Sequence, residues 1–203
     1  MQDPLQSGPS RPSISWVGAP QGAAVDAVIL PQVRDGQVVG YTYGPELDTE
    51  NRVKTFKDGS ERPQIVFLVQ TPWRNREGVS VKYLSTKPDY QDDGIRWWYC
   101  TAYAVAKAKA EAARIGGFHP GTRLRISLDE LKPNPLGNEP IKIIGVVAGP
   151  ADAESMKIME EYKQANAHLF ANPGDPLTAA QPQQPAQGQP PSQPSASGGE
   201  PPF

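Results

Sequence analysis

Apolar and polar residues follow one another along much of the chain in the patterns of β-strands. Five segments have the alternation, or the continuous run of β-branched and aromatic residues, that is typical of strands: 23–43, 63–71, 95–103, 121–131 and 139–150. The stretch "AVAKAKAEAARI" (104–115) instead has the composition of a helix, and the glycines that follow it mark the helix end. The pattern therefore predicts three β segments, a helix and two further β segments.

This order of elements predicts a mainly β fold. A five-stranded Greek-key barrel of the oligonucleotide/oligosaccharide-binding (OB) type, partly open and with its helix between strands 3 and 4, has the same order. A C-terminal helix is expected after the Gly149–Pro150 break, because Asp152 can cap a helix that runs to about Phe170. Within the polar segment 72–94, the stretch "VSVKYL" predicts a short hairpin.

Composition divides the chain into four parts. Residues 1–22 are rich in Pro, Ser, Gly and Gln and predict a disordered N-terminal arm, with Trp16 as the residue that docks it onto the domain. Residues 23–150 form the OB-like domain and residues 151–170 the C-terminal helix. Residues 171–203, a Gln/Pro/Gly-rich tail, have too few apolar side chains to fold and predict disorder.

The net charge of −2 hides an uneven distribution of charge along the chain. Residues 52–149 contain 16 Lys and Arg against 10 Asp and Glu, a balance of +6, whereas residues 1–51 and 150–203 each contain 2 basic and 6 acidic residues, a balance of −4. A basic centre between acidic flanks favours a polyanion as the partner, although an ordinary solvated surface accounts for it equally well.

Binding single strands without reading their sequence requires cations for the phosphates and aromatic faces on which bases stack. Basic and aromatic residues interleave within the segment 72–94: Trp73, Arg74, Arg76, Lys82, Tyr83, Lys87 and Tyr90. The next strand adds Arg96 and either Trp97 or Trp98, since alternation places adjacent tryptophans on opposite faces. Arg123 and Arg125 share one face of the fourth strand and extend this predicted track. The competing interpretation is that Trp73 covers the core and that the cations are merely solvated.

Catalytic and metal-binding patterns are not found in the sequence. There is no phosphate-binding G-x-x-x-x-G-K-[ST], no G-x-S-x-G and no H-E-x-x-H, and "QDDG" at 91–94 is most simply a turn. Cys100 lies within a strand without a histidine near it in sequence, and His119 lies in a helix-to-strand turn. We therefore expect no enzyme activity, no cofactor and no metal. The chain has no apolar run of 18 residues and no signal-peptide pattern, so no membrane association and a cytoplasmic location are expected.

The end of the chain, "SGGEPPF", resembles the C-terminal tip of bacterial single-stranded-DNA-binding proteins. The domain resembles those encoded by actinobacterial phages, in the stretches "PQIVFLVQT", "DDGIRWWYC", "GTRLRISL" and "PIKIIGVVAGP" across residues 63–150. The resemblance implies an OB fold that coats single strands in DNA replication, recombination and repair, in the host cytoplasm. It also implies that the tip recruits partner proteins through four residues: Glu200, Pro201, Pro202 and Phe203.

Two alternatives to single-stranded DNA binding remain from the sequence. An RNA-binding OB protein would present the same aromatic and basic residues, because only contacts to the 2′-hydroxyl distinguish the two nucleic acids. A protein-binding or structural β domain with a spacer tail belongs to a different class, and salt-insensitive binding would favour it. A homo-oligomer is compatible with all three.

Overall fold

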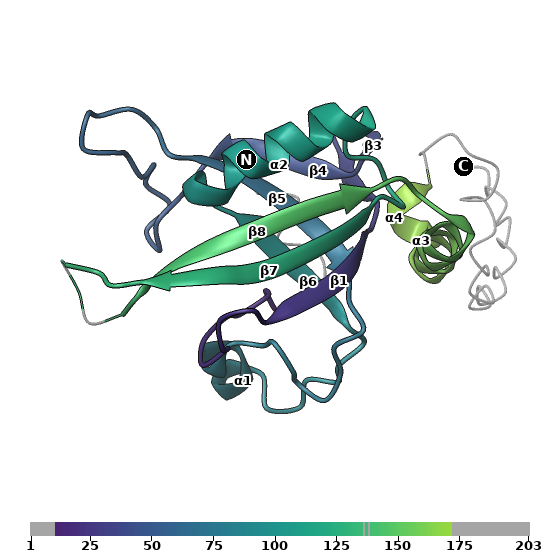
Figure 1. The fold of residues 1–203 in the computed structure, drawn as a ribbon. Coiled ribbons are helices and arrows are strands. Elements are labelled where there is room, and N and C mark those ends of the chain that lie inside the picture. The colour runs from purple at the N-terminus through teal and green to yellow at the C-terminus, as the bar shows by residue number, and fades with distance from the viewer. Residues whose placement is uncertain (1–10, 136, 138, 172–203) are drawn as a thin grey trace, which may run out of the picture. The chain divides into compact units, whose positions relative to one another are not determined.

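The computed structural model describes residues 11–135, 137 and 139–171, and its main feature is an antiparallel sheet (Figure 1). The strands pair in the order β4-β5-β1-β7-β8, and β6 pairs with the other edge of β5. Their bounds are β1 (Ala24–Ile29), β4 (Tyr41–Pro45), β5 (Pro63–Gln70), β6 (Ile95–Cys100), β7 (Arg123–Lys132) and β8 (Ile141–Gly149). A separate hairpin joins β2 (Gln32–Arg34) to β3 (Gln37–Val39). The mainly β prediction is confirmed.

The sheet is not a closed barrel. In the part of the chain that the structure describes, no pairing joins β6 to β8, the two outermost strands of the path β6-β5-β1-β7-β8. Helix α2 (Ala102–Ile115) packs along β8 instead (Figure 1). Its Glu111 Oε2 accepts a hydrogen bond from the Ala148 amide at 2.7 Å, and Arg114 donates to the Ala148 carbonyl. Side chains of α2 therefore form hydrogen bonds with the Ala148 amide and carbonyl at the edge of β8. A strand that closed the barrel would form its hydrogen bonds at this edge.

The core lies on the side of the sheet that α2 faces. Alternate residues of β5 and β6 point into it, and the rings of Phe67 and Trp98 stack there with centroids 5.0 Å apart. Leu124 and Ile126 of β7 enter the same cluster. Each large apolar side chain that is fully buried in this way contributes about 1.5–3 kcal/mol to the stability of the fold. The alternation of apolar and polar residues in the sequence thus directs one face of each of these strands into the hydrophobic core.

Residues 11–16, which we call the N-terminal segment, are fixed to the sheet and are not a disordered arm. The Trp97 amide donates to the Pro12 carbonyl and the Ile14 amide donates to the Trp97 carbonyl, both at 2.8 Å, so the segment lies along the edge of β6. Trp16 is 9% exposed and joins the core, where its ring meets Trp73 edge-on at 5.8 Å. The predicted docking role of Trp16 is confirmed. Residues 1–10 lie outside the described residues.

The helices agree with the sequence pattern except at one place. The predicted hairpin "VSVKYL" is wrong: α1 (Val81–Thr86) forms there because the Ser80 hydroxyl accepts a hydrogen bond from the Tyr83 amide at 3.2 Å and caps a helix. Asp152 caps α3 (Ala153–Ala165) as expected, in a capping box with Ser155.

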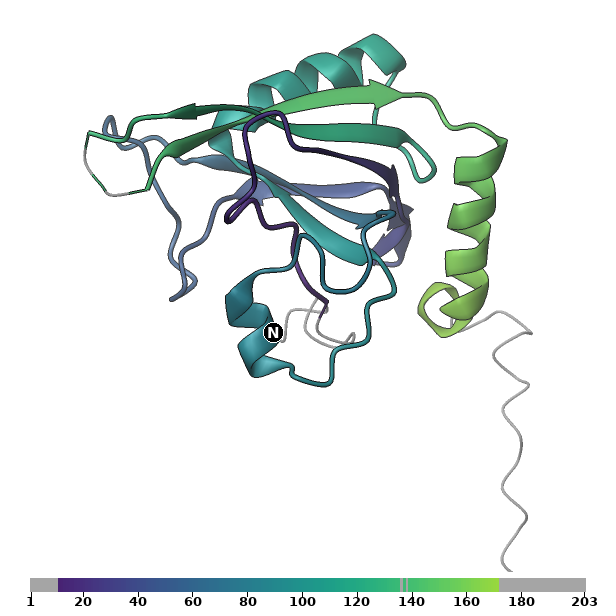
Figure 2. The same cartoon turned by 60° about the horizontal axis from the view of Figure 1, so that its bottom comes forward.

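A short α4 (Ala167–Phe170) follows α3, so the predicted C-terminal helix is interrupted at Asn166 (Figure 2). Among the described helices, none has the length and apolar content needed to cross a membrane. The predicted tail, apart from Ala171, and its tip Glu200, Pro201, Pro202 and Phe203 lie outside the described residues.

Candidate functional site

Two of the predicted ligand-binding residues are buried inside the domain. Arg96 is 0% exposed and Trp98 is 3% exposed, within the core. Alternation along β6 did place the two tryptophans on opposite faces, with Trp98 inside and Trp97 outside. Because neither Arg96 nor Trp98 reaches the surface, we leave both out of the candidate site.

A small pocket of about 260 Å³ lies over the outer face of β6, and we call it the β6 pocket. Its walls come from the N-terminal segment, from α1 and from β6 itself: Arg11, Ser13, Ser80, Lys82, Tyr83, Thr86, Trp97 and Tyr99. Trp97 is half-buried and Tyr99 is 47% exposed. The pocket thus brings together three of the predicted residues, Lys82, Tyr83 and Trp97, from segments far apart in the sequence.

The charge of the β6 pocket is positive. Its lining includes two cations and no carboxylate. Arg11 pairs with Asp93 outside the lining, whereas Lys82 makes no ion pair within residues 11–135, 137 and 139–171. Such a lining is suited to a ligand that combines flat, apolar rings with negative charges. The aromatic side chains can stack on the rings, and the ammonium group can attract the charges.

A second and larger hollow, of about 770 Å³, lies between α3 and the outer face of β1, β7 and β8, and we call it the α3 groove. It contains the predicted cations Arg74, Arg123 and Arg125. Five carboxylates line it as well: Asp26, Asp93, Asp152, Glu154 and Glu161. Arg125 pairs with Asp26 at 3.1 Å and Arg123 pairs with Asp152 at 2.6 Å, so these cations are largely neutralised. The α3 groove is therefore unsuited to a polyanion.

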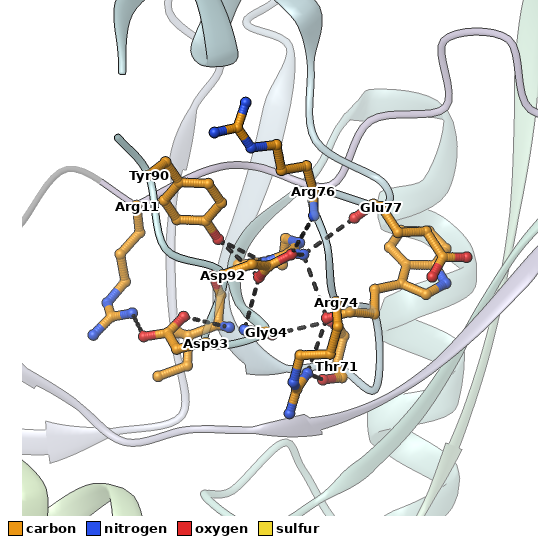
Figure 3. Close-up of polar contacts among 12 residues, drawn as sticks. Arg11, Thr71, Arg74, Arg76, Glu77, Tyr90, Asp92, Asp93 and Gly94 are labelled. Atoms are coloured by element: carbon orange, nitrogen blue, oxygen red, sulfur yellow. Dashed lines mark hydrogen bonds and ion pairs between the residues drawn. The ribbon is translucent and has the colours of Figure 1, made fainter. Parts of the chain in front are cut away.

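The remaining predicted residues belong to the segment 72–94, which is held in place from within (Figure 3). Trp73 is half-buried against Trp16, as the competing interpretation of the sequence proposed. The Tyr90 hydroxyl donates to Asp92 Oδ1 at 2.9 Å, and the Arg76 guanidinium donates to the Pro88 carbonyl at 2.6 Å. Lys87 is exposed. In this segment, only Lys82 and Tyr83 of the predicted residues face the β6 pocket.

Asp92 is the acidic centre of this segment and is 5% exposed. Burial alone would raise the pKa of its carboxyl, but hydrogen bonds from Arg96, the Gly94 amide, Tyr90 and the Arg76 amide hold the pKa well below its usual range. The pKa of Tyr90 is raised, mainly by burial and then by its hydrogen bond to Asp92. Asp92 is therefore ionised and Tyr90 is protonated at neutral pH.

The polar residues 46–62, between β4 and β5, form an ordered arm. Isolated antiparallel bridges join Leu47 to Val53 and Thr55 to Glu61. The buried carboxylate of Glu46 pairs with Lys54 at 2.8 Å and with Arg62 at 3.0 Å. One buried carboxylate thus holds two cations of the arm in place.

Two basic or aromatic residues that line the β6 pocket, Arg11 and Tyr99, are not among the residues predicted from the sequence. Tyr99 follows Trp97 by two positions, and this period-two spacing could have identified it as a second aromatic on the same face. Arg11 could not have been found in this way, because it reaches the pocket only through the pairing of Pro12 and Ile14 with Trp97.

The described residues include one buried thiol and no group of side chains suited to a metal ion. Cys100 is buried, and burial raises the pKa of its thiol to about 12, which keeps it protonated and unreactive. Of the residues with described positions, no three His, Cys, Asp or Glu side chains are grouped in a way that could hold a metal ion.

Comparison of the chain with protein-family models, with curated proteins and with solved structures gives no match. The resemblance to single-stranded-DNA-binding proteins therefore remains a prediction from the sequence.

Proposed function

We propose that the domain binds single-stranded DNA at the outer face of β6, without reading its sequence. The observation that carries the proposal is the pairing of Trp97 and Tyr99 on one face of β6, in a pocket lined by Arg11 and Lys82 and by no carboxylate. Residues two apart in a strand are about 6.6 Å apart, so the two rings offer successive surfaces for bases. Each stacked base contributes about 1–3 kcal/mol to binding, and it does so for any base.

The strand order supports the same location. If β1 to β4 are taken together as the first β segment, β5 and β6 are the second and third strands of the OB plan, and α2 lies between the third and fourth. OB domains bind oligonucleotides on the face of strands 2 and 3. The proposed fold is therefore an OB-like barrel that is open between β6 and β8.

The charge distribution supports a polyanionic ligand. Residues 52–149 carry a balance of +6, and Lys82 is the member of the β6 pocket whose charge no described carboxylate offsets. Release of counterions from the DNA backbone would then contribute to affinity and would make binding sensitive to salt. Partner recruitment by the tip, Glu200 to Phe203, is part of the proposal that rests on the sequence alone.

Fluorescence anisotropy of a labelled oligo(dT) tests the proposal. We expect salt-sensitive binding, weaker binding of a duplex, and quenching of tryptophan fluorescence by the stacked bases. Replacement of Tyr99 by alanine should weaken binding about tenfold at fixed salt, the loss of one stacked base. An oligo(U) of equal length separates DNA from RNA preference.

Tyr43→Ala is the matched control, because Tyr43 is 57% exposed on the same sheet but lies beneath Lys109 of α2, away from the β6 pocket. It should leave affinity within about twofold. Equal losses in the Tyr99 and Tyr43 variants, or no binding at low salt, would contradict the proposal.

A further inference from the structure

The buried side chain of Arg96 lies between the two ends of the segment 72–94. Its Nη2 donates to the Glu77 carbonyl at 3.1 Å, near the start of the segment, and to Asp92 Oδ2 at 2.7 Å, near the end. Its Nη1 donates to Asp92 Oδ1 at 2.8 Å and to the Tyr90 hydroxyl at 3.0 Å. One guanidinium from β6 therefore joins both ends of the segment to the sheet.

Asp92 extends this connection to a strained part of the backbone. Its Oδ2 accepts a hydrogen bond from the Arg76 amide at 2.9 Å (Figure 3). Asn75 and Arg76 have φ angles of 54° and 70°, the left-handed region that residues other than glycine rarely adopt. Two such residues in succession cost free energy, so the bond from the Arg76 amide to Asp92 stabilises a turn that would otherwise relax.

The connection reaches the β6 pocket through aromatic packing. Tyr90, whose hydroxyl contacts both Asp92 and Arg96, meets the ring of Tyr83 edge-on with centroids 5.2 Å apart. Tyr83 and Lys82 lie on α1, between the two ends that Arg96 holds, and both line the β6 pocket. The wall of the pocket is thus built on a segment whose conformation depends on one buried cation.

We propose that Arg96 and Asp92 are positioning residues, which hold α1 over β6 and keep the β6 pocket formed without touching the ligand. The inference rests on the proposed function for its effect on DNA, but the positioning itself is a property of the free protein. A guanidinium is suited to this role because its donors lie in one plane and reach several acceptors at once, whereas a lysine ammonium is a single point charge on a flexible chain.

Limited digestion with trypsin tests the positioning without any ligand. In Arg96→Lys the charge remains but the two ends of the segment are no longer joined, so we expect cleavage after Arg74, Arg76 and Lys82 to be about tenfold faster. Cleavage elsewhere, followed by mass spectrometry, should keep its wild-type rate. Arg125→Lys is the control, because Arg125 is an exposed arginine whose ion pair among the described residues is with Asp26. It should not change the digestion pattern.

Two results would overturn the proposal: wild-type cleavage rates in Arg96→Lys, or equal acceleration at every site, which indicates global destabilisation alone. If near-ultraviolet circular dichroism shows that Arg96→Lys does not fold, Tyr90→Phe replaces it. This variant removes the hydroxyl that bridges Asp92 and Arg96 but leaves their ion pair, and we expect about threefold faster cleavage confined to the same segment.

Titration with oligo(dT) separates positioning from direct contact. If the segment in Arg96→Lys is ordered about a tenth of the time, affinity falls about tenfold. The slope of log K against log salt should stay at its wild-type value, because no phosphate contact is lost. A smaller slope would show that Arg96 touches the backbone and would refute the positioning role. Absence of binding by the wild type would refute the proposed function, while the digestion still decides the role of Arg96.

Discussion

The β6 pocket and the α3 groove both lie on outer faces of the same sheet, and both contain cations that the sequence predicted to bind DNA. They differ in what surrounds those cations. In the α3 groove, Arg123 and Arg125 are each paired with a carboxylate, and further acids line the walls. In the smaller β6 pocket, Lys82 lies beside aromatic rings in a lining without carboxylates. We infer from this comparison that the neighbours of a cation, rather than the size of a hollow or the number of its arginines, decide where a polyanion would bind.

The largest expected effect is on stability, and it distinguishes Asp92, beside the β6 pocket, from Asp152 of the α3 groove. Asp92→Asn removes one member of a buried pair and leaves the Arg96 charge without compensation, so we expect a loss of about 3–5 kcal/mol in the free energy of unfolding. Asp152→Asn removes the partner of an exposed arginine, and asparagine remains a good helix cap, so we expect a loss below about 1 kcal/mol.

Denaturation by urea, followed by circular dichroism, measures both losses. Comparable losses in the two variants would mean that the Arg96–Asp92 pair is no more important to the fold than a surface ion pair.

A charge reversal in each hollow should separate them in binding. Lys82→Glu places a carboxylate beside the proposed phosphate path, and we expect affinity for oligo(dT) to fall about tenfold and the salt slope to decrease. Arg125→Glu should change affinity by less than about twofold, because Asp26 already neutralises the arginine. A larger effect at Arg125 than at Lys82 would move the proposed site to the α3 groove.

Acid should affect the segment beside the β6 pocket through Asp92. Its pKa is lowered in the folded protein, below the ordinary value of 3.8, so the unfolded chain binds this proton first as the pH falls. The stabilisation is complete above about pH 5 and is lost as the pH falls, by about 1 kcal/mol at pH 3. Urea titrations at pH 7 and pH 3 measure the loss. Asp92→Asn should lose less stability between pH 7 and pH 3 than the wild type does. An equal loss in the variant would mean that other carboxylates cause the acid dependence.

Elements whose signals are local could be predicted from the sequence. The apolar run of β5, the alanine-rich α2 and the Asp152 cap each depend on residues within a few positions, and all three are present. Within "VSVKYL", the strand pattern competes with a capping serine, and the sequence alone does not show which prevails. The Ser80 cap wins.

Features that depend on distant partners could not be predicted. The Pro/Ser/Gly-rich stretch before β1 is typical of disorder. Residues 11–16 are nevertheless held by pairing with the edge of β6 and by the packing of Trp16 in the core. Arg96 looks like a surface cation in sequence. Burial of an arginine requires several acceptors at once, and the sequence does not show that the Glu77 carbonyl and the Asp92 carboxylate converge on it. For the same reason the prediction placed Arg96 with the ligand and missed Arg11, which the fold brings to the pocket.

The docking of the N-terminal segment has a consequence for the order in which the chain matures during synthesis. Trp16 is translated before the β6 edge, along which the N-terminal segment lies, and before β7, whose Leu124 and Ile126 belong to the same core cluster. The tryptophan must therefore remain exposed until most of the domain has been translated, and its insertion is a long-range step that comes late in folding. Removal of residues 11–16 would leave every strand of the sheet in the chain and yet remove the part that completes the core.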